Sequence, residues 1–177
     1  MKNLRNLIPM MNNIVRANNA LNSVLKGTAA MIDDGLTIQE ANEYLCDIIA
    51  RKASNVFKTM KPVIEAEYVD NNTAGYYNNY EGRMFINTKH INPVESILDG
   101  DFIHAIECLG TVIHEMKHVQ QWLYNPSMFD DYVDAKDNYE AYYNHPSEVQ
   151  ARAAQAAFED RKNWLDIMEY LGSILNL

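Results

Sequence analysis

Two histidines and a glutamate form the strongest chemical pattern in the chain. His114, Glu115 and His118 occur as His-Glu-x-x-His within a stretch that we predict to be helical. Residues four apart project from the same side of a helix, so the imidazoles of His114 and His118 can converge on one ion. Glu115 is offset around the helix, which suits a general base facing a water molecule. The pattern predicts a zinc site with hydrolytic chemistry.

A zinc ion at such a site needs a third protein ligand, and Glu148 is our candidate. Glu148 lies just inside a helix that we expect to begin at Pro146, because proline is favoured in the first turn of a helix. The competing interpretation treats His114 and His118 as polar residues on a solvated helix face. The placement of the motif within a strongly patterned helix favours the zinc interpretation.

Two predicted helices position these residues. The first runs from about residue 102 to residue 123, carries apolar side chains at helical spacing and ends before Asn125-Pro126. The second begins at Pro146 and runs to about residue 164, and a last short helix follows it. The acidic, tyrosine-rich connection 130–144 lacks the spaced glycine of a calcium-binding loop, so we expect a solvated loop there.

The region before the motif helix predicts helices followed by a small sheet. Thr37 and Glu40 form a capping box within the helical region 1–60. Strands are expected at residues 63–69, 75–80 and 83–87, and two or three antiparallel strands satisfy this pattern. The predicted fold class is therefore α+β, with N-terminal helices, a small antiparallel-containing sheet, the active-site helix and a C-terminal glutamate helix.

The bulk properties of the chain limit its organisation and partners. Its 177 residues predict one domain, 1–177, in which the helical region 1–60 precedes the sheet and the two site helices of 61–177. The formal net charge of −9 argues against nucleic acid and membrane lipid as partners, because both need a basic face. Residues 1–8 lack a signal-peptide core and no stretch is long enough to span a membrane, which favours a cytoplasmic location.

Other residue types that bind metals are interpreted as structural. Cys46 and Cys108 both occupy apolar helical positions, so we expect buried thiols and no disulfide framework. His90 and His104 have no partner at ligand spacing. We expect these two histidines to be structural or solvated, which leaves the motif histidines as the metal ligands.

The motif and Glu148 together resemble the gluzincin branch of the zincin metallopeptidases. In that family, a His-Glu-x-x-His helix is completed by a glutamate from a later helix, which matches the segment 114–118 and Glu148. The layout of residues 63–158 is also similar to that of the minigluzincins and, more distantly, of the ImmA/IrrE-type regulatory peptidases. The resemblance implies a zincin-like fold, a Zn²⁺ cofactor and a peptide or protein substrate.

The chain departs from the family pattern at one position. Many larger gluzincins carry an acid four residues after the third ligand, where it orients a zinc histidine, but this chain has Arg152 there. A backbone carbonyl or Asn144 is expected to take over that role. A histidine replaces the glutamate ligand in other zincin branches, which makes His145 a competitor; we favour Glu148, because no glycine-spaced extension follows His118.

The resemblance also implies two further features of a peptidase site. One is an edge strand that binds the substrate backbone in extended form, for which 83–87 is our candidate and an ordinary sheet edge is the alternative. The other is a donor that stabilises the oxyanion, usually a tyrosine or histidine shortly before the glutamate ligand. Tyr142, Tyr143 and His145 compete for this role, and we select Tyr143.

The expected function is that of a zinc-dependent metallopeptidase in which Glu115 activates a water molecule against a peptide bond. A first alternative is a silent module in which zinc only joins the two helices and the protein acts by binding a partner. A second is a latent enzyme whose cleft is filled by the N-terminal region or the last helix. The sequence leaves the substrate and the oligomeric state open.

Overall fold

The structure is a computed structural model that describes the backbone of residues 2–176 and the side chains of residues 12–176. Met1 and Leu177, the outer bounds of the predicted domain, lie outside this part. The elements follow one another as α1 (Lys2–Asp33), α2 (Ile38–Phe57), β1 (Val63–Glu67), β2 (Gly75–Asn78), β3 (Arg83–Asn87), α3 (Pro93–Leu98), α4 (Phe102–Tyr124), the 3₁₀ helix η1 (Pro126–Phe129), α5 (Tyr139–Asn144), α6 (Pro146–Glu159), the 3₁₀ helix η2 (Arg161–Asn163) and α7 (Trp164–Leu175). The α+β class is confirmed.

The helix termini follow from local sequence signals. The capping box at the start of α2 is confirmed, since the Thr37 hydroxyl accepts from the Glu40 backbone N–H and the Glu40 carboxylate accepts from the Thr37 N–H. The glutamate helix α6 ends at Glu159, five residues earlier than predicted, because Asp160 is extended and caps η2. The connection predicted as a loop contains the short helix α5.

The three strands form a mixed sheet in the order β1-β3-β2. β1 runs parallel to β3 and β2 runs antiparallel to it. The prediction that 83–87 form the substrate-binding edge is therefore wrong, since β3 lies in the middle with both sides paired. Residue patterns identify strands but not their order; the connection after β1 carries the chain to the far edge, so β2 is the second free edge.

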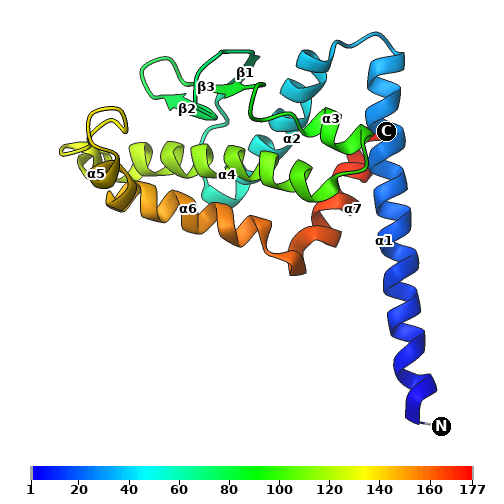
Figure 1. The fold of residues 1–177 in the computed structure, drawn as a ribbon. Coiled ribbons are helices and arrows are strands. Elements are labelled where there is room, and N and C mark those ends of the chain that lie inside the picture. Colours follow the sequence, from blue (N-terminus) through cyan, green and yellow to red (C-terminus); the bar gives the residue numbers. More distant parts are fainter. Residues whose placement is uncertain (1, 177) are drawn as a thin grey trace.

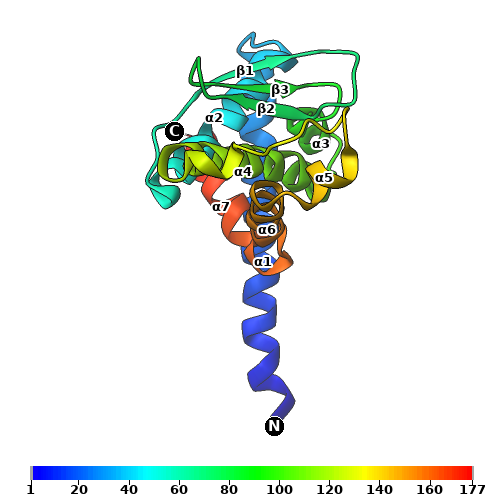
Figure 2. The same ribbon diagram turned by 90° about the vertical axis from the view of Figure 1, so that its left-hand side faces the viewer.

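Helix α4 lies between the sheet and α6 (Figures 1 and 2). Its buried face includes Ile106, Leu109, Val112 and Met116, which join the core with Met84 of β3. Helix α4 thus buries apolar residues in the core that it shares with α2, α3 and the sheet, and holds His118 and Gln121 toward α6. This arrangement brings the first turn of α6 beside the motif histidines.

The far end of the molecule is formed by α1 and α7, which pack side by side opposite α5 (Figures 1 and 2). Val24 of α1 and Leu171 of α7 are fully buried there. Cys46 and Cys108 are buried free thiols, as predicted, and burial raises the pKa of both. Among the described residues, no helix combines the length and apolar character needed to cross a membrane.

Candidate metal centre

Helices α4 and α6 bring three predicted ligands together. His118 Nε2 lies 3.1 Å from His114 Nε2 and 3.1 Å from Glu148 Oε1. His114 Nε2 lies 3.2 Å from Glu148 Oε2. The closeness of His114 and His118 follows from their four-residue spacing on α4. Glu148 comes from the first turn of α6, and its side chain is only 1% exposed. The three buried residues are in range to bind one metal ion.

The orientation of His118 is fixed by Gln121. The Gln121 amide nitrogen donates to the Ser147 carbonyl oxygen at 3.0 Å, so its amide oxygen must face the other way. That oxygen lies 2.8 Å from His118 Nδ1 and accepts its proton. The hydrogen-bond network thus assigns the proton of neutral His118 to Nδ1 and leaves the Nε2 lone pair facing Glu148 and His114.

This donor set fits a cation. Glu148 Oε2 is buried and has no hydrogen-bond partner, which is costly in an apolar interior. A tetrahedral zinc ion with bonds of about 2.0–2.1 Å separates its ligand atoms by roughly 3.3 Å, close to the separations found here. An ion among the three atoms would satisfy the unpaired carboxylate oxygen and both imidazole lone pairs.

The side chains of the cluster shift one another's pKa. Burial would raise the pKa of Glu148, but the neighbouring imidazoles of His114 and His118 outweigh it and lower that pKa below its ordinary value. Burial would lower the pKa of His118, yet the contact with Glu148 raises it.

Glu115 lies beside the three ligands without belonging to them. Its side chain is 6% exposed and lines the same cavity as His114 and His118. Its negative charge contributes to the raised pKa of His118, so the two side chains are close enough to interact electrostatically. This position beside the ligands is the one expected of a general base.

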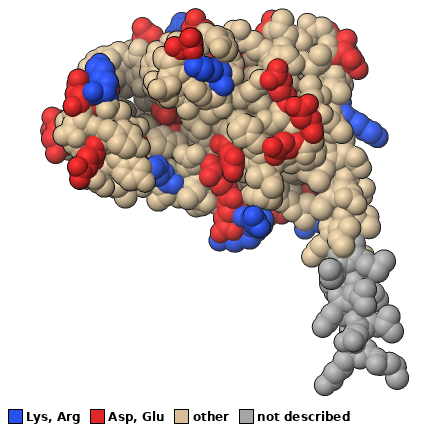
Figure 3. Space-filling model, viewed as in Figure 1, with Lys and Arg blue, Asp and Glu red and all other residues tan. Residues whose placement is uncertain are grey.

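The cluster opens into a cavity of about 1,020 Å³. One wall is β2 with the residues before it, and the other includes residues of the segment 126–144, which we call the tyrosine segment. Figure 3 shows the molecule hollowed between the sheet and the α5 region, with acidic side chains inside the hollow. No described residue of α1 or α7 lines this cavity, so the predicted latent state has no support in the described part of these helices.

Two tyrosines of this segment face Glu148. The Tyr132 hydroxyl donates to Glu148 Oε1 at 2.9 Å, and Tyr142 also interacts with this carboxylate. Burial and then the charge of Glu148 raise the pKa of both phenols. Both hydroxyls therefore keep their protons at neutral pH and act as hydrogen-bond donors within the cavity.

The structure does not bring Tyr143 to the cluster. Its side chain is 45% exposed, and the Arg152 guanidinium lies 3.9 Å above its ring, outside the cavity. In a six-residue helix such as α5, adjacent positions point in different directions, so Tyr142 faces inward and Tyr143 outward.

Arg152 occupies the position four residues after Glu148. Its Nη1 lies 3.8 Å from Glu148 Oε2, and its positive charge favours the ionised form of that carboxylate.

Two other predicted residues have structural contacts. His145 caps α6: its Nδ1 accepts from the Ser147 backbone N–H, and its Nε2 lies 3.2 Å from Asp131 Oδ1. Both of its ring nitrogens are occupied, so it is not part of the ligand set. Asn144 donates to the Glu140 carbonyl and does not orient a motif histidine. Gln121 does so instead, and its place three residues after His118 was the signal that the sequence offered.

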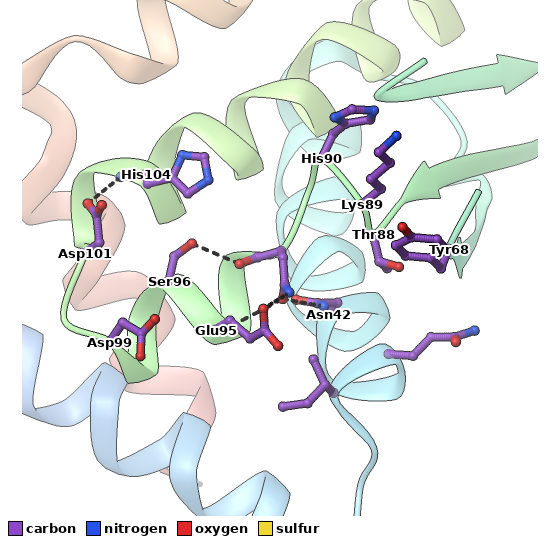
Figure 4. A pocket seen from close by; sticks show the side chains of 13 residues that line it. Asn42, Tyr68, Thr88, Lys89, His90, Glu95, Ser96, Asp99, Asp101 and His104 are labelled. Atoms are coloured by element: carbon purple, nitrogen blue, oxygen red, sulfur yellow. Dashed lines mark hydrogen bonds between the residues drawn. The ribbon is translucent and has the colours of Figure 1, made fainter. Parts of the chain in front are cut away.

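A second cavity, of about 670 Å³, lies between α2, α3 and the start of α4 (Figure 4). Its polar side chains bond to one another: Asn42 Nδ2 donates to Asn92 Oδ1, and the Ser96 hydroxyl donates to the Asn92 carbonyl. His90 and His104 line it, but neither belongs to a metal-binding group among the described residues. The chemistry is therefore concentrated at the cluster around Glu148.

Comparisons of the chain with models of known protein families, with curated proteins and with solved structures give no match. The likeness to gluzincins therefore depends on the motif residues and Glu148 alone. The geometry of the cluster supports a metal site independently of that likeness, because it follows from atom positions and burial.

Proposed function

We propose that the chain is a zinc-dependent metallopeptidase with a zincin-like fold. The observation that carries this proposal is the convergence of His114, His118 and Glu148 at one point of a large cavity, with Glu115 beside them. Two histidines and a carboxylate suit zinc, and three protein ligands leave one coordination position for water or substrate. A structural zinc site is usually closed by four protein ligands and has no need of Glu115.

The chain's own residues supply the proton transfers. Zinc at this site would acidify a water molecule and polarise the carbonyl of the bond to be cleaved. Glu115 takes a proton from the attacking water as the water oxygen bonds to the carbonyl carbon. The carbon–nitrogen bond then breaks, and Glu115 returns the proton to the leaving amine. The products are a carboxylic acid and an amine.

The oxyanion that forms during the attack needs a hydrogen-bond donor. We assign this role to Tyr142, because its protonated hydroxyl lies in the cavity near Glu148. Tyr132 already donates to Glu148 Oε1, and we assign it the task of holding this ligand in place. Tyr142 thus replaces Tyr143 as the proposed catalytic tyrosine.

Strand β2 is the proposed platform for the substrate backbone. It is a free edge of the sheet, and the successive residues Tyr76 and Tyr77 both line the cavity. The Asn87 N–H bonds to the Ala74 carbonyl, so by antiparallel alternation the backbone groups of Gly75 and Tyr77 point away from β3. An extended peptide can pair with these groups by strand addition.

Metal analysis of the wild-type chain beside Glu148→Ala tests the proposal, with cleavage of a peptide library as the second readout. We expect about one zinc ion per wild-type chain, library cleavage by this form, and neither property in Glu148→Ala. Glu81→Ala, at an exposed position outside the cavity, is the matched control and should keep both zinc and cleavage. A wild-type chain that binds zinc yet cleaves nothing would contradict the peptidase and favour the silent binding module.

A further inference from the structure

The wall of the cavity opposite β2 carries three tyrosines whose rings contact one another. Tyr132 and Tyr142 have ring centroids 6.0 Å apart in an edge-to-face arrangement, and Tyr139 lies 6.3 Å from Tyr142. All three line the cavity, and Tyr139 is 64% exposed. Tyrosine rings attract a cation over their faces, and a group of them forms a cage for a positively charged side chain.

The charged side chains that line the cavity are carboxylates, whereas Arg152 and Lys136 pair with two of them from outside the lining. The described residues that line the cavity include the carboxylates Glu115, Asp134 and Glu148, but no lysine or arginine. The net charge of the whole chain, −9, adds long-range attraction for cationic molecules.

Elsewhere in the molecule, two tyrosines already hold a cation. Arg152 lies over Tyr143, and Lys52 lies 4.9 Å from the ring centroid of Tyr170. In the part of the chain whose side chains are described, no such contact is made with Tyr132, Tyr139 or Tyr142. The ring faces of the three cavity tyrosines can thus attract a cation as those of Tyr143 and Tyr170 do, but no side chain of the described residues supplies one.

Asp134 adds a carboxylate at the rim of the same wall. Its Oδ2 lies 3.3 Å from Lys136 Nζ, at the surface of the protein. Exposed ion pairs of this kind contribute little free energy, so a cation from another molecule replaces Lys136 at small cost. Tyrosine rings and a carboxylate that can be freed form one binding surface at the cavity mouth.

We propose that the substrate is a peptide with a lysine or arginine side chain near the bond to be cleaved, and that Tyr132, Tyr139, Tyr142 and Asp134 bind this side chain. The inference rests on the proposed peptidase function. It narrows the substrate class from peptides in general to cationic peptides.

Binding of matched peptides to the full-length Glu115→Gln variant, loaded with zinc, tests this inference without cleavage. The probes are capped, fluorescein-labelled alanine octapeptides with one central lysine, norleucine or glutamate. Norleucine keeps the four-carbon chain of lysine but lacks its ammonium group, so the ratio of the two dissociation constants reports the contribution of that group. We expect the lysine peptide to bind about fivefold tighter than the norleucine peptide, and the glutamate peptide to bind weakest.

Substitutions locate the preference on the cavity wall. Tyr139→Leu and Asp134→Asn should each reduce the ratio of lysine to norleucine affinity by about twofold or more. Tyr80→Leu is the matched control, because Tyr80 is exposed on the β2–β3 turn and does not line the cavity. It should leave the ratio unchanged.

The outcomes separate this inference from the function on which it rests. Equal binding of the lysine and norleucine peptides, or no binding of either at millimolar concentration, overturns the inference even where the wild type cleaves a library. A lysine preference that depends on Tyr139 upholds the inference even where no peptide is cleaved; in that case the peptidase function is what fails. A preference that survives both Tyr139→Leu and Asp134→Asn overturns the assignment to this wall.

Discussion

The cluster of candidate ligands and the tyrosine segment meet at Glu148, yet they are built in opposite ways. The cluster lies on two regular helices, and its three ligands and Gln121 are buried. The tyrosine segment consists of short helical turns joined by loops, and most of its residues are exposed. The hydrogen bond from Tyr132 to Glu148 attaches this segment to the cluster, and the pairing of Asp131 with His145 and the stacking of Phe129 on Trp122 attach it to the two helices. Buried side chains on two regular helices thus carry the proposed ligands and base, whereas the wall opposite β2 is more exposed and less regular.

The largest expected effect within the cluster is the loss of the general base. Glu115→Gln preserves the shape of the side chain but removes the carboxylate that accepts a proton. We expect kcat to fall by about 10³-fold, within the range usual for general bases, while the zinc content stays that of the wild type. Single-turnover cleavage of a library peptide and metal analysis measure the two quantities. Equal activity in the variant would exclude the proposed mechanism.

The next effect compares adjacent tyrosines on α5. Tyr142→Phe removes the proposed oxyanion donor from the cavity, and kcat should fall by about 10²-fold with little change in KM. Tyr143→Phe alters a ring that packs against Arg152 outside the cavity, and kcat should stay within twofold of the wild type. The reverse order of effects would restore the role that sequence reasoning gave to Tyr143 and remove it from Tyr142.

The difference between the two regions also explains what the sequence could predict. Helical spacing alone brings His114 and His118 together, and the first-turn proline places Glu148 near the start of its helix. The α+β class and the boundaries of α4 followed from similar local signals. In contrast, the contact of Tyr132 with Glu148 spans sixteen residues through an aperiodic segment, for which no local pattern exists. The order of the strands depended on a crossover that the sequence does not encode locally, so β3 was misjudged as an edge.

Gln121 shows a residue that local reasoning could have found. It follows His118 by three positions on the same helix, where side chains are neighbours. Gln121→Met removes the acceptor for His118 Nδ1 while keeping a side chain of similar length. We expect zinc affinity to fall by about 10-fold or more, because residues that orient metal-bound histidines contribute to that extent. Competition with a chromogenic chelator measures the dissociation constant.

A control is needed because Gln121 also bonds to the Ser147 carbonyl and to Gln150. Gln150→Ala removes one of these other contacts but leaves the His118 interaction intact. Its zinc affinity should match that of the wild type. An equal loss of affinity in both variants would assign the effect to general packing between α4 and α6 and not to the orientation of His118.

The smallest effect concerns the attachment of the tyrosine segment to the motif helix. The Phe129 ring stacks on Trp122 at a centroid distance of 4.3 Å and lies 6.0 Å from His118. Phe129→Leu keeps an apolar side chain but loses the stacking, which should lower the free energy of unfolding by about 1 kcal/mol. If the wall is built independently of the cluster, zinc affinity should stay unchanged while hydrogen exchange in 126–138 becomes faster. A loss of zinc affinity in this variant would instead show that the tyrosine segment holds the ligands in place, so that substrate binding at the wall and metal binding at the cluster are energetically coupled.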